Sequence, residues 1–327
     1  MHFQNFLGNE KVKETVFSLF KAGRFPQAVL IEGEAGLGKK TLARDIAAML
    51  VCTGEDKPCG LCAQCVKAQK GVHPDIFEYV PSGAANSFHI ETVRTVRSDA
   101  SIIPNEAPCK IYILADCQCM NEAAQNAMLK LIEEPPDYAV FLLTVDSKAK
   151  LLPTVLSRCV ALRLEGVCTP EAAALAASAA GAGENEAAEL LQAYGGNIGR
   201  TAEALKNGKL KKHMEISEQI CYALLQGSEY ALMLSCAPFE KDRETLAGTL
   251  NVLLLLLRDA AVLAAGGSDL LFGSRELAEK LTGAFSRRQI LQMRSACRTI
   301  LENVQKNANN AIAVTQLCCL LKRAAGI

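Results

Sequence analysis

Apolar residues in the first half of the chain fall into two patterns. Short continuous runs that end at turn or acidic residues predict buried strands. These predicted strands occupy residues 28–31, 73–80, 109–116, 140–145 and 160–164. Between the runs, apolar residues recur at helical spacing, as at Leu42, Ile46 and Leu50, which turns one face of a helix toward a core. Strands that alternate with helices predict an α/β domain.

The second half of the chain has helical spacing throughout. Thr169-Pro170 fits a helix start with proline in the first turn, and Gly195-Gly196 interrupts the alanine-rich helices that follow. Farther on, Leu246, Leu250 and Leu253 recur at helical spacing in a leucine-rich region with few aromatics. Such helices suit a bundle that associates with copies of itself or with relatives. The predicted domains are residues 1–165, with an insertion at about 52–70, then 166–207 and 208–327.

The stretch AVLIEGEAGLGKKT at residues 28–41 has the strand–loop–helix context of a phosphate-binding loop. Gly33, Gly36 and Gly38 allow the backbone to curl with its N–H groups inward. Lys39 adds a positive charge, and the following helix directs its N-terminus at the phosphate. The stretch therefore predicts a loop with the shape of a nucleotide site.

Two elements that ATP hydrolysis needs are altered. The motif requires Ser or Thr after the lysine to hold Mg²⁺, but Lys40 stands there and the hydroxyl comes one residue later, at Thr41. The strand ending at Asp116 supplies an acid for Mg²⁺, but Cys117 follows where a glutamate usually polarises the attacking water. We therefore expect no efficient hydrolysis, whereas the surviving glycines and Lys39 leave ATP or ADP binding open.

Cys52, Cys59, Cys62 and Cys65 have the spacing C-x6-C-x2-C-x2-C, with glycines and a proline that supply turns. Four thiolates this close in sequence match tetrahedral zinc. The competing interpretation is four unligated cysteines in a surface insertion. We expect a structural zinc site, whose metal contributes about 10 kcal/mol of local folding free energy.

Composition and charge limit the class of protein. The chain has 35 Lys and Arg against 35 Asp and Glu, so strong nonspecific binding to nucleic acid or anionic membranes is not expected of this chain alone. The start has no signal-peptide pattern, and the longest apolar run, Val252 to Leu257, is too short to span a bilayer. Fourteen cysteines without a secretion signal indicate a reducing compartment, and we expect a cytoplasmic protein. Cys117 and Cys119 are interpreted as packing residues rather than a metal pair.

The order of these motifs resembles the bacterial clamp-loader subunits of the AAA+ class. The phosphate loop, the four-cysteine insertion and the acidic strand are followed by MLKLIEEPP at 128–136 and LLPTVLSRC at 151–159, and the resemblance covers nearly the whole chain. It implies a RecA-like AAA+ domain with a zinc-binding insertion, a small helical lid and an all-α collar. Lys40, Cys117 and Val145 make the chain similar to the delta-prime type, whose ATPase motifs are typically degraded, rather than to the gamma/tau motor.

The resemblance also implies roles for two arginines. Arg158, in the Ser-Arg-Cys trio, corresponds to an arginine finger that reaches the ATP site of a neighbouring motor subunit and stabilises charge on the transferring phosphoryl group. The alternative is that Arg158 pairs with a local acid. Arg200 falls close to the place where the family's lid sets an arginine near the nucleotide, and a solvent-exposed arginine is the alternative there.

By this resemblance the chain is a largely non-catalytic subunit of the DNA polymerase III clamp loader. It would join gamma/tau and delta subunits in a ring that sets the sliding clamp on primed DNA during replication, with no membrane involved. An active gamma/tau-type ATPase is one alternative. A zinc-stabilised nucleic-acid-binding protein that acts outside a ring is the second, and zero net charge weighs against it.

Overall fold

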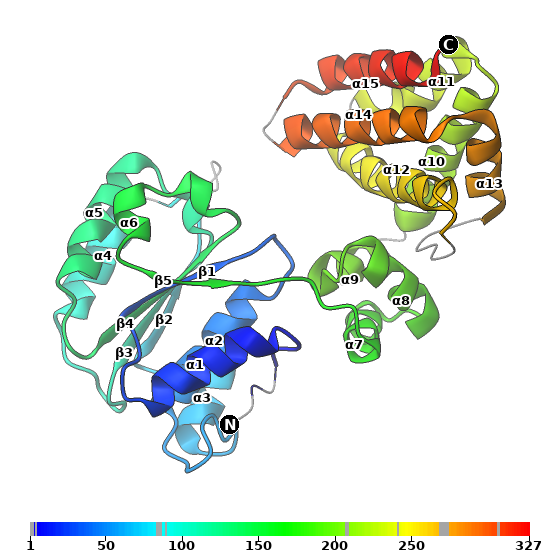
Figure 1. Ribbon diagram of the computed structural model, residues 1–327. Helices are drawn as coiled ribbons and strands as arrows, with labels where there is room; N and C mark the ends of the chain where they lie inside the picture. The colour runs from blue at the N-terminus through cyan, green and yellow to red at the C-terminus, as the bar shows by residue number, and fades with distance from the viewer. Residues whose placement is uncertain are drawn as a thin grey trace. The chain divides into compact units, whose positions relative to one another are not determined.

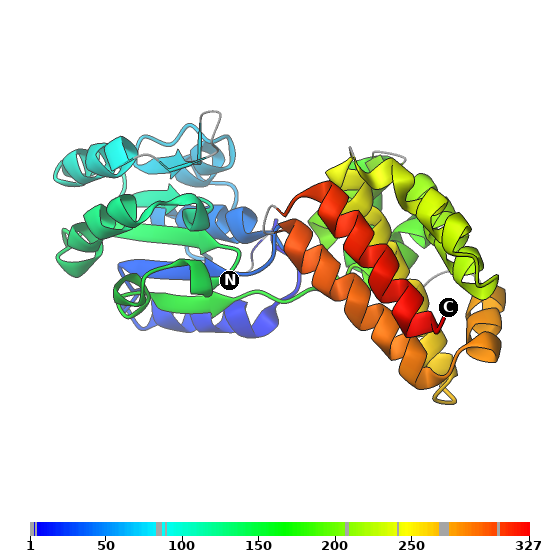
Figure 2. The same ribbon diagram turned by 90° about the horizontal axis from the view of Figure 1, so that it is seen from above.

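The computed structural model describes residues 3, 5–82, 87–88, 90–206, 209–240, 242–267, 275–305 and 308–327. The chain divides into two compact units, Met1–Val167 and Cys168–Ile327. The first is an α/β unit and the second is all helical (Figure 1, Figure 2). The predicted boundary between lid and collar, at 207/208, lies outside the described residues.

A sheet of five parallel strands forms the centre of the first unit, in the order β2-β3-β4-β1-β5. The strands are β1 (Ala28–Glu32), β2 (Ile76–Tyr79), β3 (Lys110–Leu114), β4 (Ala139–Val145) and β5 (Val160–Arg163). Each predicted run overlaps one strand, and β1 and β4 each extend one residue beyond the predicted bounds. Strand β2 begins later than predicted because His73 starts a turn, in which the Ile76 N–H donates to the His73 carbonyl at 3.2 Å.

Helices cover both faces of this sheet (Figure 1). One face packs on α1 and α2 through Val16, Leu42 and Ile46, and the other on α4, α5 and α6 through side chains such as Val96 and Met128. Because both faces are buried, β3 and β4 are apolar at nearly every position rather than alternating. The helices of this unit are α1 (Glu10–Lys21), α2 (Lys39–Val51), α3 (Ala63–Gln69), α4 (Ile90–Ala100), α5 (Glu122–Glu133) and α6 (Pro153–Leu156), with short 3-10 turns η1 (Cys117–Cys119) and η2 (Lys148–Lys150).

The strand order decides which loops meet. Strand β4 lies between β1 and β3, and all three are parallel, so their carboxyl ends share one edge of the sheet. The glycine loop follows β1, Asp116 follows β3 and Asp146 follows β4. A switch in strand order at the carboxyl edge is the usual place for a ligand in such a sheet.

The opposite edge of the sheet holds the other predicted groups. Helix α2 runs back from the loop, so Cys52 and the cysteine insertion begin where α2 ends. Arg158 lies in the turn before β5, whose first residue pairs with Val29 near the start of β1. A five-residue strand at about 3.3 Å per residue therefore separates Arg158 from its own loop by roughly 15 Å along the sheet.

The second unit contains two hydrophobic cores. A small one, built from alanines of α7, α8 and α9, includes Ala176, Ala187 and Ala202. A larger, leucine-rich core lies mainly among the helices that follow, and Leu190 of α8 also belongs to it. The helices are α7 (Pro170–Ala180), α8 (Glu184–Ala193), α9 (Ile198–Lys206), α10 (Lys209–Leu225), α11 (Glu229–Cys236), α12 (Arg243–Leu263), α13 (Arg275–Ala284), α14 (Arg287–Gln305) and α15 (Asn310–Ala325), with a 3-10 turn η3 (Ala237–Glu240).

Helix α12 extends beyond the six-residue apolar run seen in the sequence. Within the described residues it is the one helix long and apolar enough, by length and composition, to cross a membrane. This is weak evidence, since a core helix of a soluble protein passes the same test and half of the apolar window is buried in the unit. Leu250, Leu253 and Leu257 of α12 all belong to the large core.

Candidate functional site

The glycine loop has the backbone that the sequence predicts. Gly36 and Gly38 have φ angles of 94° and 83°, in the region that favours glycine. Gly38 is also the N-cap of α2, and a Cβ there would lie 3.3 Å from the Phe6 ring. A side chain at Gly38 would therefore be strained by the backbone and crowded by Phe6. The loop leads directly into the N-terminus of a 13-residue helix, as an anion site requires.

Lys39 is turned into its own protein. Its side chain is 5% exposed, and Nζ donates to Asp146 Oδ1 at 2.6 Å. The same ammonium donates to the carbonyl oxygens of Gly33 at 2.7 Å and Glu34 at 3.1 Å. An ammonium has three N–H groups, so these contacts use all of its donors. A phosphate could bind Lys39 only by replacing Asp146 or a loop carbonyl.

Asp146 is held in place from a second side. Gln118 Nε2 donates to Asp146 Oδ2 at 3.1 Å, and the Asp146 N–H donates back to Gln118 Oε1 at 3.2 Å. Gln118 lies in η1, after β3, so two neighbouring strand ends fix the carboxylate that Lys39 contacts. The Asp146 carboxylate therefore occupies the Lys39 ammonium that a nucleotide phosphate would need.

Lys40 pairs with the predicted metal-binding acid. Its Nζ lies 2.9 Å from Asp116 Oδ2, and both side chains are partly exposed. Asp116 has a left-handed backbone with φ of 55°, and its N–H donates to the buried Thr144 Oγ1 at 2.9 Å. The Lys40 ammonium thus lies beside Asp116, the acid that would help to hold Mg²⁺ in an active ATPase.

Cys117 is unsuited to activate water. Its side chain is completely buried, and Sγ donates to the Leu114 carbonyl at 3.2 Å. Burial raises the pKa of the Cys117 thiol well above its usual range. A buried, protonated thiol cannot accept a proton from an attacking water. Cys117 therefore cannot replace the glutamate that acts as general base in an active site.

The four cysteines of the insertion converge. Their sulfur atoms all lie within 4.8 Å of one another, and this is the one group of three or more metal-binding side chains found in the described ranges. The Cys52–Cys59, Cys52–Cys62 and Cys59–Cys65 sulfur distances are 3.5, 3.9 and 4.0 Å. Sulfurs at ~2.3 Å from a tetrahedral zinc stand roughly 3.8 Å apart, so this donor set fits zinc.

Backbone N–H groups surround these sulfurs. Those of Cys59, Cys62 and Cys65 donate to the sulfur of the preceding cysteine in the cluster, at 3.3 to 3.4 Å. Burial opposes ionisation of Cys62, but N–H donors from Cys65 and Thr53 outweigh it and lower the pKa of its thiol to about 5. For Cys65 burial dominates and raises the pKa. Gly54 leaves room for the cluster, since a Cβ there would meet Cys59 Sγ at 2.9 Å.

Arg158 lies at the surface and is paired within its own unit. Nη2 is 2.7 Å from Glu133 Oε1, and the two side chains are 36% and 40% exposed. Nη1 donates to the Thr154 carbonyl at 2.8 Å and to Ser157 Oγ at 3.3 Å. In the isolated chain the guanidinium therefore makes the local ion pair that the sequence left as the alternative. Its assignment as a finger stays a prediction.

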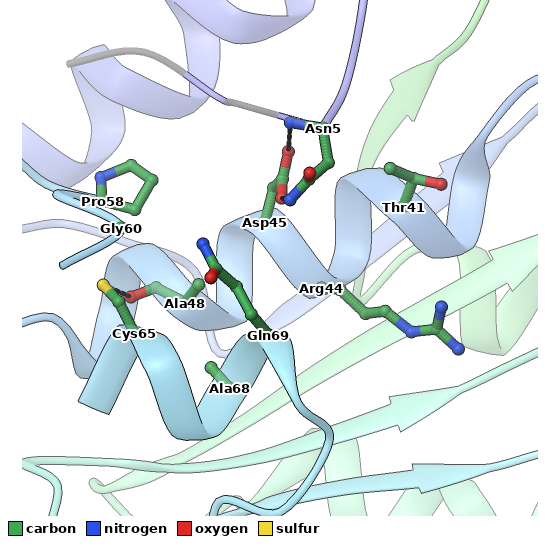
Figure 3. A pocket seen from close by; sticks show the side chains of 10 residues that line it. All are labelled: Asn5, Thr41, Arg44, Asp45, Ala48, Pro58, Gly60, Cys65, Ala68 and Gln69. Atoms are coloured by element: carbon green, nitrogen blue, oxygen red, sulfur yellow. Dashed lines mark hydrogen bonds between the residues drawn. The ribbon is translucent and has the colours of Figure 1, made fainter. Parts of the chain in front are cut away.

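The two remaining predicted residues, Arg200 and Thr41, lie in different units of the chain. Arg200 belongs to α9 of the second unit, where its N–H donates to Asn197 Oδ1 at 3.1 Å, and its nucleotide role stays a prediction. Thr41 lines a pocket of about 380 Å³ between α2, α3 and the N-terminal segment (Figure 3). Asp45, in the same pocket, accepts from the Asn5 side chain at 3.1 Å.

Three functional side chains were missed by sequence reasoning. Asp146 directly follows a buried strand, and an acid at that position is a sequence signal for a residue at the carboxyl edge of the sheet. Gln118 sits in a 3-10 turn that strand patterns do not predict. Glu133 comes from a helix end 25 positions before Arg158, so its pairing with Arg158 depends on how α5 and α6 pack.

Comparison with known proteins identifies relatives. The family model described as "DNA polymerase III, delta subunit" matches residues 8–167. The DNA polymerase III subunit delta' of Haemophilus influenzae is 35% identical over 228 residues, which cover 68% of this chain and 68% of that protein. The tau subunit of Escherichia coli is 32% identical over 167 residues, which cover 50% of this chain but 26% of that subunit.

A solved structure has a distant overall likeness. The gamma subunit-related protein of Thermotoga maritima matches 95% of this chain and 99% of its own chain, with 20% identity and a TM-score of 0.42. The assignment rests on the sequence relatives instead, because a delta' subunit above 30% identity is matched over two thirds of its length. The chain therefore belongs to the DNA polymerase III clamp-loader family.

Proposed function

We propose that this chain is a delta-prime-like clamp-loader subunit that supplies Arg158 in trans and does not itself hydrolyse ATP. It would assemble in the cytoplasm with gamma/tau and delta subunits, and through them act on the sliding clamp and primed DNA. The match to a delta' subunit over two thirds of the chain supports this role. The tau matches cover about half of this chain and 26 to 28% of the tau subunits.

The observation that carries the proposal is the pairing of both loop lysines with the chain's own carboxylates. Lys39 is buried on Asp146, and Lys40 pairs with Asp116. A hydrolytic site needs the first lysine on the β- and γ-phosphates and the acid on Mg²⁺. Here each group already has a partner of opposite charge, and a third requirement, the general base, is a buried thiol at Cys117.

The place of Arg158 supports action on a neighbour. Arg158 precedes β5 and lies at the amino edge of the sheet, whereas the loop follows β1 at the carboxyl edge. A side chain at the amino edge cannot reach a phosphate on its own loop. It can reach one carried by a second subunit packed against that edge, as a finger acting in trans does.

An exposed apolar groove on the helical unit also fits a subunit of a larger assembly. Helix α11 exposes Tyr230, Met233 and Leu234, which line a groove with residues of α15, and exposed apolar patches mark protein interfaces. We propose that α10 to α15 form the collar and that α7 to α9 form the lid, where Arg200 would approach nucleotide. We also propose that Cys52, Cys59, Cys62 and Cys65 hold a structural zinc ion.

ATP turnover by the purified chain tests the first part of the proposal. We expect no turnover above the level of a Lys39→Ala variant, because neither metal ligation nor a general base is available in the loop. Turnover that exceeds this control by tenfold or more would instead favour an active gamma/tau-type motor. Duplex DNA binding by the isolated chain that weakens steeply with salt would favour the zinc-stabilised nucleic-acid-binding protein.

A further inference from the structure

Three contacts hold the Arg158 guanidinium against its own unit. Glu133 occupies Nη2, and Thr154 and Ser157 share Nη1. Arginine binds a phosphoryl group most strongly through two parallel N–H···O hydrogen bonds. Nε takes no part in the three contacts, but together they hold the guanidinium against its own unit. Extension of the side chain toward another subunit moves it away from Glu133, so delivery competes with this ion pair.

The position of Glu133 explains why the arginine rests there. Glu133 is the last residue of α5, and Glu134 follows it as the C-cap, so negative side chains stand at the negative end of the helix dipole. The Thr154 carbonyl that accepts from Arg158 belongs to the short helix α6. The guanidinium thus neutralises the end of α5 and caps α6, and both contacts favour the retracted side chain.

We propose that Glu133 is a positioning residue that holds Arg158 in a retracted state and releases it when a neighbouring subunit presents a phosphate. This inference rests on the proposed function of Arg158. The Glu133 and Arg158 side chains are 40% and 36% exposed, so water screens their attraction and the pair is easily exchanged. A phosphoryl group carries more charge than one carboxylate and sits in a drier subunit interface, where it attracts the guanidinium more strongly.

The inference makes Glu133 a competitor of the reaction rather than a part of it. An exposed ion pair shifts an equilibrium by roughly two- to fivefold. Removing the carboxylate should therefore raise the fraction of rings in which Arg158 contacts phosphate by about that factor. The gain should appear only for ligands that resemble the transferring phosphoryl group, since Arg158 contacts no other part of the nucleotide in this scheme.

The experiment uses the chain assembled with its gamma/tau and delta partners. ADP with aluminium fluoride serves as the probe, and ADP alone is the reference ligand. We expect Glu133→Gln to tighten binding of ADP–aluminium fluoride about two- to fivefold, with ADP binding unchanged. Glu134→Gln is the matched control, because it removes the same charge one residue away and no contact joins Glu134 to Arg158 among the described residues.

The outcomes separate the two ideas. In an Arg158→Ala background, Glu133→Gln should have no effect, because the group it restrains is gone. If Arg158→Ala lowers ring turnover but Glu133→Gln binds the probe no better than wild type, or more weakly, the retraction idea is wrong and the finger stands. If Arg158→Ala changes nothing, the proposed function fails, and the role of Glu133 fails with it.

Discussion

Arg158→Ala should slow ATP hydrolysis at the neighbouring motor site by about a thousandfold, the lower end of the effect of an arginine finger supplied in trans. The guanidinium would stabilise charge that develops on the transferring phosphoryl group, and alanine offers no replacement. Other sites of the proposed ring would not depend on Arg158. Single-turnover hydrolysis by the reconstituted complex should therefore show one slow phase. Steady-state ATP turnover should fall by the contribution of the motor site that Arg158 serves.

Assembly and folding should survive this substitution, because Arg158 is a surface residue in an exposed ion pair. Arg163→Ala is the matched control, since Arg163 ends β5, the strand that Arg158 precedes, and so lies at the opposite edge of the sheet. Its variant should hydrolyse ATP like the wild-type ring. If the assembled Arg158→Ala and wild-type complexes hydrolyse ATP at equal rates, Arg158 is not an arginine finger.

Loss of one zinc ligand should unfold the insertion. Cys62→Ser removes a thiolate that two N–H donors favour, and the metal contributes about 10 kcal/mol to a structural site of this kind. We expect zinc content to fall from about one ion per chain to near zero. Amide exchange in residues 52–70 should then become fast, with a smaller change in the sheet, because α3 of the insertion packs mainly on α2.

Cys119→Ser provides the comparison for this variant. Cys119 is a partly buried thiol of the same unit, but it lies in η1 and outside the four-sulfur cluster. It should keep full zinc content and a protected insertion. A Cys62→Ser protein that retains both would show that the insertion folds without a metal, as the competing interpretation of four unligated cysteines holds.

Much of the fold follows from local pattern. Buried parallel strands are continuous apolar runs, so β1, β3 and β4 were recognisable, and the cysteine spacing predicted a cluster that the structure assembles. Strand ends were less certain, because turn geometry decides them. The turn at His73 shortens β2, and the left-handed Asp116 lies beyond the end of β3 rather than within it.

The partners of the charged groups could not be found in the same way. Lys40 was recognised as a misplaced residue, but its pairing with Asp116 depends on the strand order, which brings the ends of β1 and β3 to either side of β4. The same order sets Asp146 on Lys39. Glu133 meets Arg158 only because α5 packs on α6. Periodicity fixes which residues are buried, whereas ion pairs depend on topology and helix packing.

We propose that this subunit's own loop hydrolyses no ATP while Arg158 acts at the site of a neighbour. One comparison tests it most directly: ATP turnover of the reconstituted ring carrying either Lys39→Ala or Arg158→Ala in this chain, with folding checked by circular dichroism. The account predicts wild-type turnover with Lys39→Ala and reduced turnover with Arg158→Ala. Reduced turnover with Lys39→Ala and wild-type turnover with Arg158→Ala would contradict it.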